Sequence, residues 1–204
     1  MSLLAFGLNH RRAPISVLEK AALDEVSLDR ILSAAEASPD ISEHLVVATC
    51  NRTEIYAEVS GFHGAVADLT DAMTTSTGIT HDDLKEHLDL HYGDAAVAHV
   101  FNVAAGLDSM AVGESQILGQ LRDALARGQA GGHVGPSINS LVQQALRTGK
   151  QVHSETGIDE VSRSLVGVGL DAAEQHVGPL AQAHVLVVGA GAKGPQAESV
   201  RVVA

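Results

Sequence analysis

The sequence has few aromatic residues and a single cysteine. Phe, Trp and Tyr make up 2% of the 204 residues, and tryptophan is absent. Apolar residues still make up 45% of the chain, enough for a buried core that must be built mainly from Ala, Val, Leu and Ile. The one cysteine, Cys50, excludes an internal disulfide and fits a reducing compartment.

Long hydrophobic runs are missing as well. A membrane-spanning helix needs about 20 consecutive, mostly apolar residues, and no such run occurs in this sequence. Residues 1–8 contain no basic residue, and their apolar run is too short for a signal peptide. We therefore expect a cytoplasmic protein.

Positive charge is scarce too. The chain carries 13 Lys and Arg against 25 Asp and Glu, which gives a formal net charge of −12. Most of the imbalance lies in residues 1–100, with 6 Lys and Arg against 16 Asp and Glu. Nucleic-acid-binding domains usually present a basic face, because phosphate contacts supply most of their non-specific affinity. An RNA substrate would therefore make few phosphate contacts with this chain, or would be bound mainly by another domain or protein.

Hydrophobic patterns in residues 1–92 predict an alternation of strands and helices. Helices are expected after Ser16, which can cap the first of them, and at residues 28–35 and 65–73. Strands are expected at residues 3–8, 44–49, 54–59 and 87–91, the third with the alternation of a half-buried strand. The order β-α-β-β-α-β is typical of the ferredoxin-like split unit. Cys50 would lie in the tight connection between the second and third strands, where a rigid scaffold can hold a reactive side chain.

From residue 94 onward the pattern becomes helical. Helices are predicted at residues 97–104, 117–125, 138–152 and 164–176, followed by a strand at 185–188 that runs into a glycine segment. The predicted fold class is α+β. Residues 1–155 form a ferredoxin-like domain with a helical extension, and residues 156–204 begin an incomplete Rossmann-type α/β segment.

Cys50 allows two interpretations. A free cysteine most often packs as a small hydrophobic residue, so a lone thiol is more often a buried spectator. Here, however, an apolar strand leads to a polar cluster that continues with Asn51, Arg52, Thr53 and Glu54. A guanidinium two residues away favours the thiolate, which is the form that attacks carbonyl carbons. By spacing alone, an ordinary solvated turn remains the commoner interpretation of Arg52 and Glu54.

Local reasoning leaves two other features open. His99, one of 11 histidines, flanks an apolar stripe and could line a cleft or face solvent. The glycine-bracketed connection at residues 106–116 is either a linker with capping residues or a segment that binds a small polar ligand. The single cysteine cannot form a CxxC pair, and no protein-bound metal is expected.

Two long motifs resemble those of glutamyl-tRNA reductases. Residues 48–56, ATCNRTEIY, are similar to the catalytic segment of that family, and residues 106–120, GLDSMAVGESQILGQ, are similar to its second signature. Residues 7–11 and 147–150 also resemble family segments, in the expected order. The resemblance extends from residue 1 to residue 194.

The resemblance implies a two-step reaction. Cys50 would attack the ester carbonyl that joins glutamate to its tRNA, giving an enzyme thioester and free tRNA. Hydride from NADPH would then reduce the thioester to glutamate-1-semialdehyde, the entry to tetrapyrrole (porphyrin) biosynthesis. A thioester is more readily reduced than an oxygen ester, so the covalent step prepares the carbon for hydride.

The resemblance also implies roles for individual residues. Cys50 and His99 would be catalytic, with His99 transferring protons or orienting other groups. Arg52 would bind the substrate's carboxylate through its planar guanidinium. The other substrate-binding residues would be Thr49, Asn51, Ser109, Glu114, Ser115, Gln116 and Gln120.

The glycine segment is expected to begin an NADPH-binding loop. It follows a strand, as in dinucleotide-binding folds, and consists of Gly189, Ala190, Gly191, Ala192, Lys193 and Gly194. Pro195 follows at once, where a long amphipathic helix should face the pyrophosphate. The predicted cofactor is NADPH, but the residues after Gly194 read as a truncated or frameshifted continuation.

Two hypotheses from different classes follow. In the first, the chain is a glutamyl-tRNA reductase by its site chemistry and at least forms and hydrolyses the thioester. In the alternative, it is a non-catalytic remnant that binds glutamyl-tRNA or a partner protein. The family also implies contact with glutamate-1-semialdehyde aminomutase and a homodimer, although the dimerisation domain is not part of this sequence.

Overall fold

The chain falls into two compact units, Met1–Ser162 and Arg163–Ala204, each with its own sheet. The computed structural model describes residues 2–110, 112–113, 116–156, 158, 165–180, 185–191 and 194–200. In this part of the chain, no helix is both long and apolar enough to cross a membrane.

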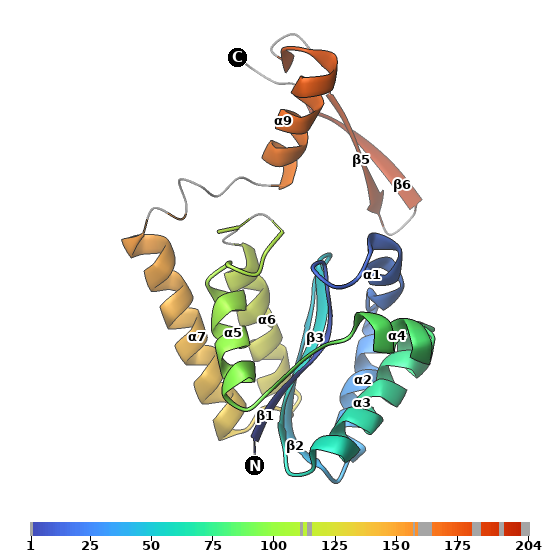
Figure 1. Ribbon diagram of the computed structural model, residues 1–204, viewed down its shortest axis with the longest axis vertical. Helices are drawn as coiled ribbons and strands as arrows, with labels where there is room; N and C mark the ends of the chain where they lie inside the picture. The colour runs from blue at the N-terminus through green and yellow to red at the C-terminus, as the bar shows by residue number, and fades with distance from the viewer. Residues whose placement is uncertain are drawn as a thin grey trace. The chain divides into compact units, whose positions relative to one another are not determined.

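A four-stranded antiparallel sheet forms the centre of the first unit (Figure 1). Its strands are β1 (Ser2–Asn9), β2 (Ile41–Ala48), β3 (Arg52–Val59) and β4 (Asp89–Tyr92), in the spatial order β2-β3-β1-β4. β1 pairs antiparallel with both β3 and β4, and β2 pairs antiparallel with β3. The predicted alternation of strands and helices is confirmed, and the crossover before β4 contains one short helix more than the sequence predicted.

Four helices cover one face of this sheet: α1 (Ile15–Ala21), α2 (Glu25–Ala37), α3 (Phe62–Thr77) and α4 (His81–His87). The start of α2 is fixed by Asp24, whose side chain accepts a hydrogen bond of 2.8 Å from the Ser27 backbone N–H. The predicted capping role of Ser16 is wrong, because α1 begins one residue earlier with Pro14 at the N-cap position. Proline suits this place, since its fixed φ and missing N–H cost nothing at a helix start.

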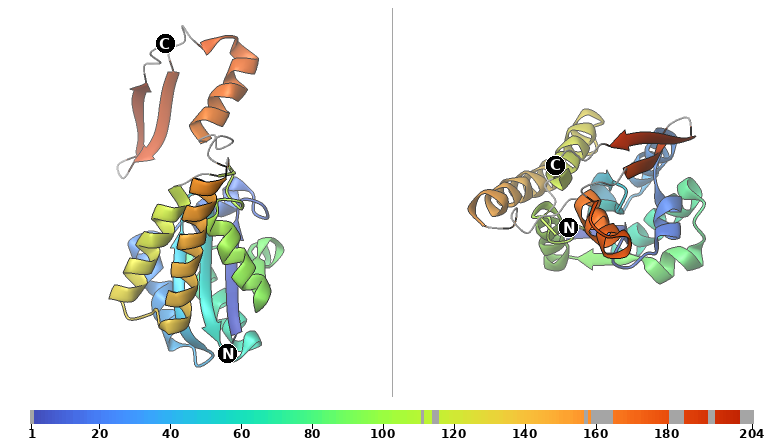
Figure 2. Two further views of the ribbon diagram at one scale, coloured as in Figure 1. Left: turned by 90° about the vertical axis from the view of Figure 1, so that its left-hand side faces the viewer. Right: turned by 90° about the horizontal axis from the view of Figure 1, so that it is seen from above.

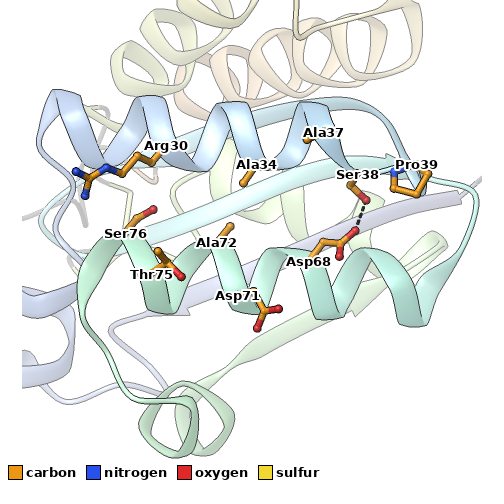
Figure 3. Close-up of a pocket in the computed structure, with 10 residues that line it drawn as sticks. All are labelled: Arg30, Ala34, Ala37, Ser38, Pro39, Asp68, Asp71, Ala72, Thr75 and Ser76. Atoms are coloured by element: carbon orange, nitrogen blue, oxygen red, sulfur yellow. Dashed lines mark hydrogen bonds between the residues drawn. The ribbon is translucent and has the colours of Figure 1, made fainter.

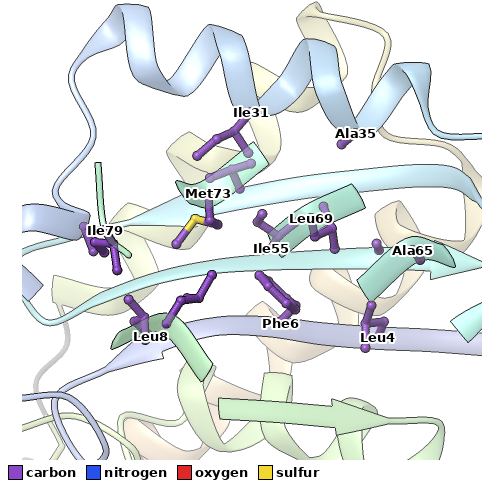
Figure 4. Packing of buried hydrophobic residues seen from close by; sticks show 14 of the residues in the cluster. Leu4, Phe6, Leu8, Ile31, Ala35, Ile55, Ala65, Leu69, Met73 and Ile79 are labelled. Atoms are coloured by element: carbon purple, nitrogen blue, oxygen red, sulfur yellow. The ribbon is translucent and has the colours of Figure 1, made fainter. Parts of the chain in front are cut away.

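The core on this side lies between the sheet and helices α2 and α3 (Figure 4). Fully buried side chains from the strands, among them Leu4, Phe6 and Ile55, meet Ile31 of α2 and Leu69 of α3. These aliphatic contacts bear out the expectation of a core that needs few aromatic rings.

The helical extension predicted after residue 94 packs on the opposite face of the sheet (Figures 1 and 2). It consists of α5 (Asp94–Ala104), α6 (Gln116–Ala130) and α7 (Pro136–Glu155). Gly149 lets α7 approach α5 closely, because a Cβ at this position would lie 2.4 Å from the Ala104 carbonyl oxygen. The apolar core between the sheet and these three helices contains Ala5, Leu45, Val47, Tyr56, Val100, Leu121, Ile138 and Val142.

Strand β3 is therefore buried on both sides, and the prediction of a half-buried strand is wrong. Ile55 and Ala57 belong to the core beneath α2 and α3, whereas Tyr56 belongs to the core beneath α5, α6 and α7. Arg52 and Glu54 share the face of Tyr56, since side chains two residues apart in a strand point the same way. The polar–apolar alternation of β3 thus distinguishes two buried faces. The face towards α2 and α3 is apolar, and the face towards α5, α6 and α7 contains charged side chains.

The second unit contains, in its described part, helix α9 (Leu165–Val177) and a hairpin of β5 (Val185–Gly191) and β6 (Gly194–Val200). The two strands pair antiparallel from Val185 opposite Val200 to Gly191 opposite Gly194. α9 and β5 agree with the predicted helix and strand, but the glycine segment lies in the hairpin and not in a loop that enters a helix. Glycines on both sides of the turn favour a tight reversal, and no helical periodicity follows them.

Candidate active site

Cys50 lies in the short connection between β2 and β3 and is exposed to solvent. The Thr49 backbone N–H donates to the Arg52 carbonyl oxygen at 2.8 Å, which closes the turn. The Thr49 hydroxyl oxygen accepts a hydrogen bond of 3.1 Å from the Asn51 backbone N–H. This turn holds the thiol at the end of a rigid hairpin, and the interpretation of Cys50 as a buried spectator is excluded.

A second turn, at the end of β1, lies beside the turn that carries Cys50. Asn9 pairs with Arg52 in the sheet register, and the His10 backbone N–H donates to the Asn51 carbonyl oxygen at 3.0 Å. The next two residues, Arg11 and Arg12, expose more than half of their side chains. Two largely exposed guanidinium groups therefore lie at the same end of the sheet as the thiol.

Arg52 is not part of a solvated turn, because its side chain is only 2% exposed. Its guanidinium donates to Glu54 Oε1 at 2.9 Å and to both the carbonyl oxygen and Oδ2 of Asp108, the latter at 3.2 Å. Burial alone would lower the pKa of Arg52, but the negative charges of Glu54 and Asp108 raise it. This guanidinium joins β3 to the connection between α5 and α6, and it is already paired with two carboxylates.

Glu54 is the centre of this network. Its Oε2 accepts hydrogen bonds from the Tyr56 hydroxyl at 2.7 Å and pairs with His99 Nε2 at 3.0 Å, while Oε1 accepts from Arg52. Burial would raise the pKa of Glu54, but the hydrogen bond from His99 and the charge of Arg52 outweigh it and lower the value to about 2. The carboxylate is therefore ionised at neutral pH although it is fully enclosed.

His99 projects from α5 towards β3 and is 7% exposed. Its ring stacks on that of His91 from β4, with centroids 4.3 Å apart and planes tilted by 14°. Burial would lower the pKa of His99, but the hydrogen bond and charge of Glu54 raise it above 6.5. Both its ring plane and its charge state are thus set by neighbouring residues.

A cavity of about 420 Å³ lies over this cluster. It is lined by Arg11, Arg12, Asp89, His91, Ala95, Ala98, His99, Asn102 and Asp108. Arg11 Nε lies 2.6 Å from Asp108 Oδ1, and Arg12 Nη1 lies 3.7 Å from Asp89 Oδ1. The cavity carries both signs of charge, which suits a ligand with both an ammonium and a carboxylate.

Another cavity, of about 450 Å³, lies between α2 and α3 and contains none of the predicted site residues (Figure 3). Its walls are mainly small side chains, and Ser38 donates to Asp68 across it at 2.5 Å. It has no buried charge cluster, whereas the smaller cavity is lined by His99 and Asp108 of the charged network; Cys50 is not among the lining residues of either cavity.

Two groups of side chains place possible metal ligands within 4.8 Å of one another: Asp89, His91 and His99, and Glu54, His99 and Asp108. In the first, the imidazole rings are stacked nearly parallel, so their in-plane lone pairs do not converge on one point. In the second, the Arg52 guanidinium already contacts both carboxylates. These donors suit proton transfer better than metal ligation, and the prediction that the site holds no metal stays a prediction.

Comparisons with known proteins show the family of the chain. The family described as "Glutamyl-tRNAGlu reductase, N-terminal domain" matches residues 6–156. The chain belongs to the glutamyl-tRNA reductase family. Its likeness to these enzymes therefore covers the sheet, the Cys50 turn and helices α5, α6 and α7.

Individual members of the glutamyl-tRNA reductase family are closely similar over almost the whole chain. The chain is 49% identical over 199 residues to glutamyl-tRNA reductase 1 of Nocardioides sp., covering 98% of this chain and 46% of that protein. It is 50% identical over 192 residues to the Kineococcus radiotolerans glutamyl-tRNA reductase, covering 94% and 43%. The solved glutamyl-tRNA reductase from Methanopyrus kandleri matches with a TM-score of 0.60 and 30% identity, covering 88% of this chain and 41% of that one. The chain thus spans less than half the length of these relatives.

The second signature of the glutamyl-tRNA reductase family is only partly brought to the cavity. Ser109 is half-buried next to Asp108, while Gln116 is exposed and Gln120 half-buried in the first turns of α6. None of the three lines the cavity. Glu114 and Ser115 lie outside the described residues.

Sequence reasoning missed most of the charged network. Glu54 was interpreted as a turn residue, and Tyr56, Asp108, Asp89 and His91 were not predicted as site residues. One signal was available: Arg52, Glu54 and Tyr56 recur at every second position of a strand, so they share one face. Three polar groups in a row on one face of a strand predict either a solvent-facing surface or a buried network.

The predicted cofactor residues lie in the second unit. Gly189, Ala190 and Gly191 belong to β5 and Gly194 begins β6, while Ala192 and Lys193 lie outside the described residues. A dinucleotide phosphate normally sits at the N-terminus of the helix that follows a glycine loop. The β5–β6 hairpin offers no such helix end among the described residues, so this segment does not fit NADPH in that manner.

Proposed function

We propose that this chain carries the acyl-transfer site of a glutamyl-tRNA reductase, with Cys50 as the nucleophile. The Cys50 thiolate would attack the carbonyl carbon of the glutamyl ester and form a C–S bond. The C–O bond to the terminal ribose of tRNA(Glu) would break, and the tRNA oxygen would leave with a proton. The observation that carries this proposal is an exposed thiol in the turn that leads into β3, the strand whose Glu54 pairs with His99.

His99 is the group proposed to move the proton. Its raised pKa, caused mainly by Glu54, makes a protonated imidazole available near neutral pH. A proton given to the departing tRNA oxygen makes tRNA release easier, and the same ring can take the thiol proton beforehand. His99 lines the cavity of about 420 Å³, together with Arg11, Arg12 and Asp89.

The reduction step is proposed for the full-length glutamyl-tRNA reductase. When bound, NADPH would supply the hydride that converts the thioester to glutamate-1-semialdehyde, which enters tetrapyrrole biosynthesis. Because the glycine segment forms a hairpin, the reaction proposed for residues 1–204 is thioester formation followed by hydrolysis.

The substrate contacts proposed from the family motif are Thr49, Asn51, Arg52, Ser109, Glu114, Ser115, Gln116 and Gln120. For Arg52 the structure favours a modified role, because its guanidinium is enclosed between Glu54 and Asp108. We propose that it anchors the two carboxylates and thereby shapes the pocket.

Arg12 is the better candidate for reading the free carboxylate of the glutamyl group. Its side chain is 55% exposed at the cavity, and its pairing with Asp89 is loose, at 3.7 Å. Asp89 is held by the Asn9 side-chain amide at 2.6 Å, so its carboxylate is fixed at the cavity wall. The glutamyl group has one ammonium and one carboxylate, which complement Asp89 and Arg12.

Further parts of the proposal concern architecture and context. The strand order β2-β3-β1-β4 supports a ferredoxin-like assignment for the sheet. The reactive thiol supports a reducing, cytoplasmic setting. A homodimer and contact with glutamate-1-semialdehyde aminomutase are proposed by family membership alone.

Single-turnover discharge of glutamyl-tRNA tests the proposal. The purified chain should release uncharged tRNA from labelled glutamyl-tRNA(Glu), and Cys50→Ser should abolish the release. Equal discharge by the two proteins would show that the chain is a non-catalytic binder at most. Added NADPH should yield no semialdehyde with this chain.

A further inference from the structure

We propose that Glu54 is the positioning residue of this site: it accepts the Nε2–H of His99 and thereby directs Nδ1 to the cavity as the proton-transfer atom. The inference rests on the proposed function and adds to it the identity of the working nitrogen. Its starting point is the distance of 3.0 Å between Glu54 Oε2 and His99 Nε2, both buried.

Glu54 is itself immobilised. Oε1 is held by Arg52 at 2.9 Å, and Oε2 is held by the Tyr56 hydroxyl at 2.7 Å. All three side chains project from the same face of β3, in the middle of a sheet that is covered on both sides. A carboxylate with both oxygens fixed in this way can accept a hydrogen bond from His99 in only one geometry.

This geometry selects one tautomer of His99. A neutral imidazole has one N–H, and the ionised Glu54 can only accept, so that N–H must be at Nε2. Nδ1 then carries the lone pair. Nδ1 has no hydrogen-bond partner among the described residues, and it is not one of the fully enclosed nitrogens without a partner. It therefore meets the cavity that His99 lines.

The ring is also held against rotation. His91 stacks on it at 4.3 Å, and Tyr56 meets it edge-on at 6.3 Å between centroids. When Nδ1 takes a proton, Glu54 stabilises the resulting imidazolium, as a buried carboxylate does in a Ser-His-Asp triad. The proton on Nδ1 would then pass to the departing tRNA oxygen, which leaves as a hydroxyl.

Other charged groups surround the ring and affect its titration. From β3 these are Glu54, Arg52 and Tyr56; from β4, Asp89 and His91; from the α5–α6 connection, Asp108; and from the turn after β1, Arg11 and Arg12. Only Glu54 among them has a direct hydrogen bond with His99. Its removal should therefore move the titration of His99 more than removal of any other carboxylate.

The test is ¹⁵N NMR of the histidine rings in the intact chain, with His99 assigned by comparison with His99→Gln. The wild-type spectrum at high pH should show His99 protonated at Nε2, and Glu54→Gln should lower the midpoint of its titration by about one pH unit or more. Asp89→Asn is the matched control, because that carboxylate contacts His91; it should shift His99 far less.

Rates of glutamyl-tRNA discharge give the second measurement. Glu54→Gln should slow the reaction about 100-fold and move its pH profile in the same direction as the NMR midpoint, and Glu54→Asp should restore part of the rate. A wild-type His99 protonated at Nδ1, or an unchanged midpoint in Glu54→Gln, would overturn the proposal. The wild-type tautomer is measured without turnover and without any change at Cys50, so it is decided separately from the role of Cys50.

Discussion

Glu54 Oε2 and His99 Nε2 lie 3.0 Å apart, and both side chains are almost completely enclosed. The strand supplies the carboxylate, and a helix that is 45 residues further along the chain supplies the imidazole. Because the pair lies between the sheet and α5, it connects the stability of the first unit to the proton chemistry of its cavity.

Breaking the Arg52 network should destabilise the fold. Arg52→Ala removes the buried guanidinium that Glu54 and Asp108 share and leaves them only His99 and Arg11 as partners, at a cost of about 3–5 kcal/mol in the free energy of unfolding. Urea denaturation measures the difference. Arg30→Ala, at an exposed position of α2, is the matched control and should change the value by less than about 0.5 kcal/mol. Equal losses in the free energy of unfolding from both substitutions would show that the buried network does not stabilise the fold.

Acid should weaken the first unit through Glu54. Its pKa is lowered from 4.5 to about 2 in the folded chain, so the stabilisation is complete above pH 4.5 and is lost as the pH falls towards 2. The raised pKa of His99 affects stability at alkaline pH. The stabilisation by protonated His99 is complete below pH 6.5 and is lost as the pH rises through the raised pKa. Unfolding free energies measured from pH 2 to pH 9 should decline at both ends, and Glu54→Gln should flatten both declines.

His44 should produce a separate pH effect. The ring of this buried residue of β2 contacts that of His133, with centroids 4.8 Å apart and planes tilted by 32°. Burial together with the charge of His133 lowers the pKa of His44 from 6.5 to about 4. A histidine that is kept neutral in the fold contributes stability above 6.5 and loses it as the pH falls to 4. His44→Leu should remove this part of the decline in the unfolding free energy. A variant that declines as steeply as wild type between pH 6.5 and 4 would exclude the assignment.

Arg12 should determine the preference for a glutamyl over a glutaminyl group. Loss of a charge-assisted hydrogen bond to the substrate carboxylate should reduce that preference about 10-fold or more. The measurement compares discharge of glutamate and glutamine carried by the same tRNA, in wild type, Arg12→Ala and Arg30→Ala. Selectivity that falls in both variants, or in neither, would refute the role of Arg12.

Much of the fold could be predicted because local sequence patterns determine many of its helices, strands and turns. The short strand at 3–8, the polar turn after Thr49 and the aliphatic stripe of the helix that contains Val100 each depend on a few neighbouring residues. The early start of α1 was missed because Pro14 and Ser16 are both acceptable near a helix N-terminus, and the choice between them is not local.

The charged network could not be predicted because it depends on tertiary contacts. No sequence pattern near Arg52 predicts its contact with Asp108. Asp108 is 56 residues away and reaches Arg52 only when α5 packs on the sheet. The same holds for Glu54 and His99. Cys50 could be singled out because its surroundings are sequential: a strand, a short turn and a second strand.

The most direct test of the central claim is to locate the glutamyl group on the protein. After brief incubation with labelled glutamyl-tRNA(Glu) and quenching in acid, the account predicts label on the peptide that contains Cys50, released by hydroxylamine as expected for a thioester and absent from Cys50→Ser. Label on another peptide, or none while the tRNA is still discharged, would contradict it.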